Sequence, residues 1–256
     1  MFWRILKKDL KRKRTMNIIL LLFVILCSMF AAAAVNNIIA VTGGIEHYFD
    51  AANVPDVTVM TLGENDAGER LAELACVREI KTEHWLSCSS KSFWHNGKKL
   101  DNFTNAACLI SDGEMAINYF DENNNIIENV DRGCFYASAP FLQDVAIKKG
   151  DEVELTVGDC HLTLQFMGRF KGALSRSGKA DSPYLIINSA DYDCLDKDEA
   201  AHILNYKQFY INTSDVDEIK ELAKNYDRVF VITREESKSI YLYDMLLAYA
   251  LMIISV

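Results

Sequence analysis

The sequence predicts an α+β fold in three parts: a transmembrane helix, an extracellular domain, and the start of a second transmembrane helix. Within the domain we expect a βαβ-based layer formed from both ends of the domain and a β-rich subdomain inserted between them. Three observations predict this order. An uncharged run of membrane length follows a basic N-terminus, strand–helix–strand patterns lie near both ends of the acidic body, and short alternating runs fill its middle.

The N-terminal arm is strongly basic. Residues 1–15 carry seven Lys or Arg against one acid, Asp9, a net charge of +6; because the chain carries −9, the remainder carries −15. Residues 15–45 contain no charge, and 16–35 have the length of one transmembrane helix. Since basic residues gather on the cytoplasmic side, we predict a cytoplasmic amphipathic segment at 1–15 and an extracellular or periplasmic body. A membrane face, and not nucleic acid, is then the partner of the arm.

A cleaved signal peptide is the alternative, because it also has a basic start, an apolar run and small residues such as the alanines at 31–34. The apolar run here exceeds the usual length of about 7–15 residues, and uncharged residues continue past the alanines. Leu26 stands before Cys27 where a lipoprotein signal needs a small residue. The sequence favours an uncleaved anchor.

A first strand–helix–strand pattern follows a helical stalk at 36–52. The stretch "PDVTVMTL" alternates as a strand does, "ENDAGERLAELACV" places apolar residues on one helical face, and "REIKTEHWLSC" alternates again. Asn65 or Asp66 is expected to cap the helix.

A second such pattern lies near the other end of the body. We predict a strand at 207–214, a helix in "SDVDEIKELAKNY" with Ser214 as its N-cap, and a strand at 227–233. Each unit alone would leave one face of its sheet bare, so the two units should form one membrane-proximal layer. This layer is assigned to 53–90 together with 206–238.

The inserted β-rich subdomain is assigned to 91–205. Strands are expected in "NAACLISDG" and "MAINYFDENNN", and a hairpin should join Glu152–Val157 to His161–Phe166 through a Gly-Asp turn. The polar, glycine- and serine-rich residues 171–182 should form a mobile loop. "SADYDCLDKDEAAHILN" is typical of a capped turn leading into a short helix.

The chain closes with a second apolar run, 241–256, predicted to begin a second transmembrane helix. From Met245 to Val256 a helix covers only about 18 Å, whereas a bilayer core needs about 30 Å. We therefore expect this span to be cut at Val256.

Seven cysteines are present, of which Cys27 lies in the first span. An even number in the body permits disulfides in many pairings, while irregular spacing without C-x-x-C argues against zinc. The interpretation favoured by the sequence is that the six are free, buried or half-buried thiols. They are Cys76, Cys88, Cys108, Cys134, Cys160 and Cys194.

No motif in the sequence supports a catalytic, cofactor or metal site. The loop from Gly172 to Ala180 has the wrong spacing and lacks the hydroxyl that a phosphate-binding loop needs, and neither H-E-x-x-H nor G-x-S-x-G occurs. His84 and Cys88 stand alone as a metal-ligand pair. We expect no enzymatic activity and no cofactor. The acids of the segment "SADYDCLDKDEAAHILN" are interpreted as solvated surface: Asp191, Asp193, Asp196, Asp198 and Glu199.

Three stretches together resemble permeases of the MacB/FtsX type, which are subunits of ATP-binding-cassette (ABC) transporters. They are the opening "MFWRILKKDLKRKRTMNIILLLFVIL", the segment "SAPFLQDVAIKKGDEVELTV…LTLQFMGRFKGA" at 138–173, and the closing helix, strand and apolar run. The middle segment is similar to the family's short helix, "xxGDxVxL" and strand pair ending in "xxGxxK". The order of span and domain carries the resemblance along the whole chain.

The resemblance implies that the chain is the N-terminal part of a permease subunit, with no catalytic activity of its own. Its extracellular domain would transmit ATP-driven motion of the spans, for export or extraction of peptides, lipoproteins or antimicrobial compounds. The implied partners are the lipid bilayer, an ABC ATPase subunit bound through a later part of the permease, and a second permease unit. Because the family continues past the second span, Val256 is expected to mark a truncation. The alternative is a membrane-anchored extracellular sensor or binding domain without transport activity.

Overall fold

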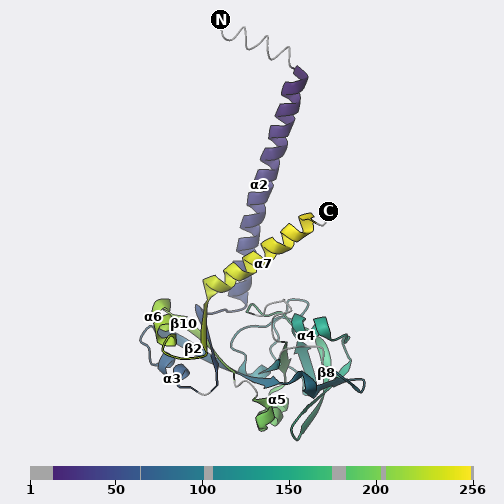
Figure 1. Ribbon diagram of the computed structural model, residues 1–256, viewed down its shortest axis with the longest axis vertical. Coiled ribbons are helices and arrows are strands. Elements are labelled where there is room, and N and C mark those ends of the chain that lie inside the picture. The colour runs from purple at the N-terminus through teal and green to yellow at the C-terminus, as the bar shows by residue number, and fades with distance from the viewer. Residues whose placement is uncertain (1–13, 64, 101–105, 175–182, 203–205, 255–256) are drawn as a thin grey trace.

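A computed structural model describes residues 14–63, 65–100, 106–174, 183–202 and 206–254. It confirms the predicted α+β class: a long apolar helix, α2 (Arg14–Ala51), leads into a domain built on one curled sheet, and a last helix, α7 (Arg234–Ile254), leaves that domain on the same side as α2 (Figure 1). The basic arm before Arg14, most of the polar loop at 171–182 and the last two residues lie outside the described residues.

The sheet has eleven strands in the order β11-β1-β10-β2-β5-β9-β6-β8-β7-β3-β4. The strands are β1 (Val57–Leu62), β2 (Val77–Cys88), β3 (Phe93–His95), β4 (Lys98–Lys99), β5 (Ala107–Ser111), β6 (Cys134–Ala137), β7 (Glu152–Val157), β8 (Cys160–Arg169), β9 (Tyr184–Ile187), β10 (Tyr206–Thr213) and β11 (Val229–Thr233). The shorter helices are α3 (Ala67–Ala72), α4 (Ala139–Asp144), α5 (Ser189–Asp196) and α6 (Val216–Ala223), with 3₁₀ turns at Ser90–Ser92, Asp112–Glu114 and Glu199–Ala201.

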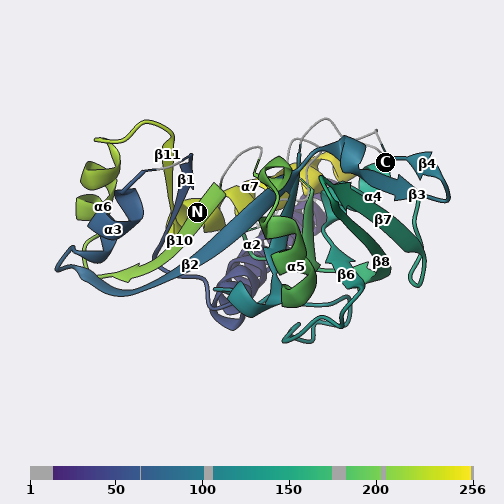
Figure 2. The same ribbon diagram turned by 90° about the horizontal axis from the view of Figure 1, so that it is seen from below.

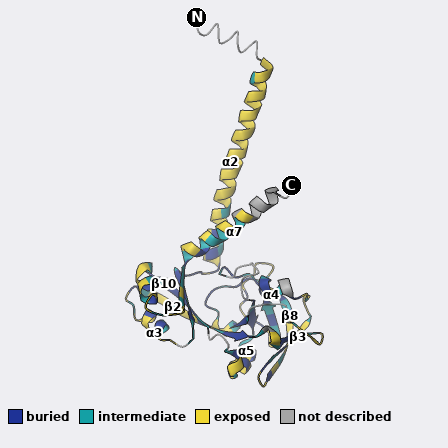
Figure 3. Cartoon of the chain, viewed as in Figure 1, coloured by how far each residue is buried: buried dark blue, intermediate teal, exposed yellow. Residues whose placement is uncertain are grey.

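Helix α2 joins the predicted span and stalk into one unbroken helix of 38 residues. At 1.5 Å per residue it is about 57 Å long, nearly twice the thickness of a bilayer core. Its outer length is exposed on all sides, and only Ile45 and Phe49 near its end are buried (Figure 3). Among the described helices, α2 alone is long and apolar enough to cross a membrane.

The four strands β11, β1, β10 and β2 form the layer that the sequence predicts from both ends of the domain. Each contacts its neighbour antiparallel, so β1 and β2 run in one direction with β10 between them. This is the split βαβ order of ferredoxin-like domains. Helices α3 and α6 lie side by side on one face of the layer (Figure 2). There Leu71 and Ile219 are buried against Val59 and Ile211.

The first residues of helix α6 are capped by Asp215, not by Ser214 as the sequence suggested. The Asp215 carboxylate accepts hydrogen bonds from the backbone N–H groups of Asp217 and Glu218. Ser214 instead donates its hydroxyl to the carbonyl of Cys76. A carboxylate also suits the positive end of the helix dipole, which explains why the acid takes the capping position.

The β-rich part is not a separate sheet. The last four residues of β2 pair with β5, so this one long strand belongs to both parts and makes the sheet continuous. The predicted hairpin is confirmed as β7 and β8, paired from Glu152 with Gln165 to Val157 with Cys160. Its turn needs a glycine, because Gly158 has φ +54° and a Cβ there would lie 1.5 Å from the Asp198 carboxylate.

The prediction of a strand in "MAINYFDENNN" is wrong. Residues 115–125 form an irregular segment whose ladder contacts are the isolated bridges of Phe120 to Ile126 and to Lys171. The Asp121 carboxylate accepts hydrogen bonds from the N–H groups of Asn123 and Asn125, each at 2.8 Å. Local capping by this side chain competes with strand pairing and turns the chain.

Helix α7 begins at Arg234, seven residues before the predicted start of the second span. A capping box sets this start: Glu236 N–H donates to the Thr233 hydroxyl at 3.1 Å, and Thr233 N–H donates to the Glu236 carboxylate at 2.8 Å. The apolar run is thus the later part of a helix with a charged first turn. Whether it enters a membrane stays a prediction, as do the assigned domain boundaries.

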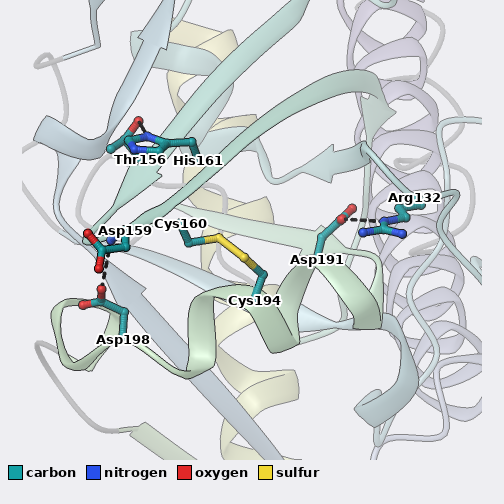
Figure 4. Close-up of a disulfide and its surroundings, with 8 residues drawn as sticks. All are labelled: Arg132, Thr156, Asp159, Cys160, His161, Asp191, Cys194 and Asp198. Carbon is teal, nitrogen blue, oxygen red and sulfur yellow. Dashed lines mark hydrogen bonds and ion pairs between the residues drawn. A yellow bond between two sulfur atoms is a disulfide. The ribbon is translucent and has the colours of Figure 1, made fainter.

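The expectation of six free thiols is wrong for one pair. Cys160 at the start of β8 and Cys194 in α5 form a disulfide (Figure 4). The other four body cysteines are free, and Cys76, Cys88 and Cys108 among them are buried. Sequence spacing did not reveal the bridge because its partners lie on elements that meet only in the folded sheet.

Candidate functional site

The base of α2 meets the first turn of α7 in a cluster of charges. The Arg234 guanidinium donates to the carboxylates of Asp50 and Glu46, the latter at 3.2 Å, and to the carbonyl of Val54 at 2.6 Å. One turn further along α7, Lys238 forms an ion pair with Glu46. The Arg234 and Lys238 side chains are only 18% and 16% exposed, so both cations lie largely within the junction.

An aromatic cluster lies beneath these charges. Phe49 is fully buried and contacts the Tyr241 ring edge to face, with ring centroids 5.6 Å apart, while Tyr48 contacts both Tyr241 and Phe120. The Arg234 guanidinium also lies over the Phe49 ring, 5.8 Å from its centre. Burial raises the pKa of Tyr48 to about 12. The two helices are therefore joined by packing as well as by charge.

The β-rich part of the domain contacts the same base through two segments. Asn118 donates its backbone N–H to the carbonyl of Ala52 and its side-chain amide to the carbonyl of Ala51, both at 2.9 Å. The Tyr241 hydroxyl donates to the carbonyl of Gly172 at 3.1 Å. The end of α2 thus contacts α7 and the loops of the β-rich part at one place. We call this set the junction: Glu46, Tyr48, Phe49, Asp50, Asn118, Phe120, Arg234, Lys238 and Tyr241.

Hydrogen bonds and cations stabilise the charged forms of Glu46 in the junction and of Glu236 beside it in the first turn of α7. The Lys238 ammonium, and then Arg234, lower the pKa of the Glu46 carboxyl. The hydrogen bond from the Thr233 N–H, followed by the one from Lys220, lowers the pKa of Glu236. Both carboxylates are therefore ionised near neutral pH.

Two of the acids predicted to be solvated surface have structural roles instead: Asp191 is buried, and Asp198 caps a turn. Asp191 accepts a hydrogen bond from Gly133 N–H at 2.7 Å and ion-pairs with Arg132 (Figure 4). Asp198 caps the 3₁₀ turn at Ala200 and accepts from Asp159 N–H. His84 is exposed whereas Cys88 is buried. Within the described ranges, no three His, Cys, Asp or Glu side chains are grouped to hold a metal.

Sequence reasoning did not find the junction. Its acids and cations are separated by about 190 positions along the chain, and each looks like an ordinary surface charge beside an apolar run. The one local signal was the T-x-x-E capping box at Thr233–Glu236, which would have placed Arg234 and Lys238 in the first turns of a helix.

No protein-family model matches the sequence, and no curated protein matches it. Among solved structures, a protein from Bacillus anthracis described as a lipoprotein aligns at TM-score 0.39 and 8% identity, over 69% of this chain and 96% of its own. A domain of a protein described as a permease, from Porphyromonas gingivalis, aligns at TM-score 0.37 and 8% identity, over 69% and 88%. The extracellular domain of the noncanonic ABC-type transporter YknZ from Gram-positive bacteria aligns at TM-score 0.35 and 8% identity, over 69% and 100%. These values are too low to assign the chain to the family of any of the three.

Proposed function

We propose that this chain is the N-terminal part of the permease subunit of an ABC transporter, of the MacB/FtsX type. In this proposal residues 16–35 of α2 are the first span and the rest of the helix is a stalk. The sheet domain lies outside the cell, and the apolar part of α7 begins the second span. The domain transmits ATP-driven motion of the spans to an exported or extracted peptide, lipoprotein or antimicrobial compound. The partners are the bilayer, an ABC ATPase and a second permease unit. The chain itself is proposed to have no catalytic activity.

The observation that carries the proposal is the junction. A span can move an outer domain only if the span is itself rigid and contacts that domain directly. Helix α2 is unbroken from Arg14 to Ala51, and its base is joined by ion pairs to α7 and by hydrogen bonds to the β-rich part. A tilt of α2 against α7 therefore acts on both parts of the domain at once.

The first experiment is to purify the tagged full chain, in its native gene context, from native membranes and identify the proteins that remain bound. An ABC ATPase that hydrolyses ATP in the complex is the expected result. A chain that is recovered alone, under conditions that preserve its fold, would contradict the transporter proposal and favour the anchored sensor or binding domain.

A second experiment tests transmission in that complex. Glu46→Cys and Lys238→Cys place thiols at the contact between α2 and α7, and a short bifunctional thiol reagent then fixes the two helices together. We expect the bridged complex to lose most of its coupled ATP hydrolysis. Hydrolysis should be kept by two sets of controls treated alike: each single variant, and the pair Arg70→Cys and Glu73→Cys, which are exposed at the end of α3. Unchanged hydrolysis in the bridged complex would argue against motion at the junction.

A further inference from the structure

Glu83 is a fully buried carboxyl in the middle of the sheet. It lies on β2, opposite Gln208 of β10, on the face of the four-strand layer turned away from α3 and α6. A buried carboxylate needs hydrogen-bond partners for both oxygen atoms, since burying it without them costs several kcal/mol.

Donors from three places surround the Glu83 carboxyl. The Tyr210 hydroxyl on β10 is 2.6 Å from Oε2, and the Trp85 indole N–H on β2 is 3.0 Å from the same oxygen. From the segment 115–120, Ala116 N–H is 2.6 Å from Oε1 and the Tyr119 hydroxyl lies 3.3–3.4 Å from both oxygens. The carboxyl therefore joins this irregular segment to the β2–β10 ladder.

The Glu83 carboxyl has no ion-pair partner among the described residues. Lys81, two positions back on the same face of β2, ion-pairs with the exposed Glu79 at 3.6 Å. The titratable groups that face Glu83 are the hydroxyls of Tyr119 and Tyr210, with Tyr184 beyond Tyr119. Burial raises the pKa of Glu83 above its ordinary value of 4.5, although these donors oppose the shift.

The same network accommodates a protonated carboxyl. Ala116 N–H and Trp85 N–H can only donate, but each tyrosine hydroxyl can either donate or accept. When Glu83 gains a proton on Oε2, the Tyr210 hydroxyl can turn and accept it at the same 2.6 Å separation. Both Glu83 oxygens therefore keep a partner in either state.

The segment that Glu83 holds is also the one that contacts α2. Ala116 and Tyr119 bond to Glu83, while Asn118 between them bonds to the carbonyls of Ala51 and Ala52 at the end of the helix. Phe120 follows and packs beside Tyr48. The short segment 116–119 thus connects the Glu83 carboxyl to the base of the apolar helix.

We propose that Glu83, Tyr119 and Tyr210 form a proton-binding latch that closes residues 115–120 onto the sheet, and with them the contact to α2. The direction follows from linkage: the closed state binds the proton more tightly than an opened, hydrated state, so protonation favours closure. The closed state gains stability as the pH falls through the raised pKa of Glu83, and the gain is complete below the ordinary value of 4.5. This inference concerns the fold alone and does not rest on transport.

The test uses the full chain in detergent with Trp3→Phe and Trp94→Phe, which leave Trp85 as the sole indole. We expect an infrared band of a buried protonated carboxyl to appear on acidification before the exposed carboxylates titrate, with a parallel change in Trp85 emission. Glu83→Gln should remove both changes, whereas Glu79→Gln, on the same face of β2 but exposed, should keep them. A band that persists in Glu83→Gln, or no band in the parent, would overturn the proposal.

The coupling between protonation of Glu83 and closure of residues 115–120 is measured by amide hydrogen exchange at Ala116 and Asn118. The rates are corrected for the intrinsic effect of pH on exchange. Protection should rise by up to about tenfold for each unit that the pH falls across the titration of Glu83, since one proton is bound on closure. It should be independent of pH in Glu83→Gln. If that variant fails to fold, Tyr210→Phe serves instead: it removes the hydroxyl that donates to the ionised carboxylate and should move the titration of Glu83 to higher pH. Protection that follows pH equally in these variants would exclude the latch.

Discussion

Arg234 shows how one residue can join segments that are far apart in the chain. Its side chain is 18% exposed, whereas its partners Asp50 and Glu46 are 65% and 50% exposed. Ion pairs with exposed carboxylates each contribute only about 0–1 kcal/mol. The bond to the carbonyl of Val54 and the contact with the Phe49 ring are more sheltered from water. The planar guanidinium is needed to reach all four groups at once.

Arg234→Ala is expected to lower the free energy of unfolding by about 2 kcal/mol, mainly through loss of the charged hydrogen bond to Val54. Arg234→Lys should recover less than half of this, because an ammonium cannot form the same fork. The measurement is denaturant unfolding of the full chain in detergent. Arg70→Ala, which removes an arginine with a 58% exposed side chain on α3, is the matched control and should change stability by less than about 0.5 kcal/mol. Equal effects of the two alanine variants would contradict the role given to Arg234.

At the scale of elements, close packing decides which local sequence preferences matter. Gly68 lies in α3, where glycine is a poor helix former, yet a Cβ at this position would lie 2.3 Å from the Phe209 ring of β10. The helix can approach the sheet because the side chain is absent. Gly43 and Gly44 in α2 have open space around them, and there the helix continues despite the glycines.

Gly68→Ala should therefore destabilise the domain by about 1–3 kcal/mol through overpacking, even though alanine favours a helix by about 1 kcal/mol. Gly44→Ala should be neutral or slightly stabilising, because nothing lies within 4 Å of the added methyl group. Unfolding of both variants in the same denaturant series compares the two effects directly. A stabilised Gly68→Ala variant would show that α3 is not packed on Phe209 as described.

The disulfide acts at the same scale, since it joins the β7–β8 hairpin to α5. Its cysteines are 34 positions apart in the sequence. Closing a loop of this length restricts the unfolded chain and contributes about 3–4 kcal/mol.

In the oxidised protein, denaturant without reductant should expose Cys88 to alkylation but leave Cys160 and Cys194 unmodified. Burial raises the pKa of the Cys88 thiol to about 12, so Cys88 should not react in the native state. Cys160→Ala with Cys194→Ala should lower the free energy of unfolding by about 3 kcal/mol. Mass spectrometry of the alkylated peptides checks the pairing, and modification of Cys194 before reduction would disprove it.

At the scale of the whole molecule, both helices leave the domain on one side (Figure 1). The apolar surface of α2 is exposed along its length, whereas the domain has buried cores of its own. Such an exposed apolar helix is stable in lipid and not in water. In the proposed topology the sheet domain and the basic arm lie on opposite sides of the membrane.

A thiol at Glu73→Cys, exposed just after α3, should react with a membrane-impermeant maleimide on intact cells. Lys8→Cys in the basic arm should react only after permeabilisation. The parent chain, treated identically, corrects for its own cysteines. Labelling of Lys8→Cys from outside would reverse the predicted orientation.

The sequence by itself determined what depends on neighbours along the chain. The apolar run of α2, the strand–helix–strand units and the β7–β8 hairpin follow from hydrophobic periodicity and a Gly-Asp turn, and each was predicted within a few residues. These signals are local, because side chains at spacings of two, three or four residues define the face that is buried.

Only the tertiary structure decided which of these elements meet. The pairing of Cys160 with Cys194, the cluster around Arg234 and the donors around Glu83 each bring together residues from distant segments. In the sequence Glu83 is one more charge in an alternating strand, and nothing marks it as buried. Its burial follows because β2 extends beyond β10 to pair with β5, while residues 115–120 cross over the same face. Contacts of this kind depend on how the sheet curls, which the spacing of residues along the chain does not encode.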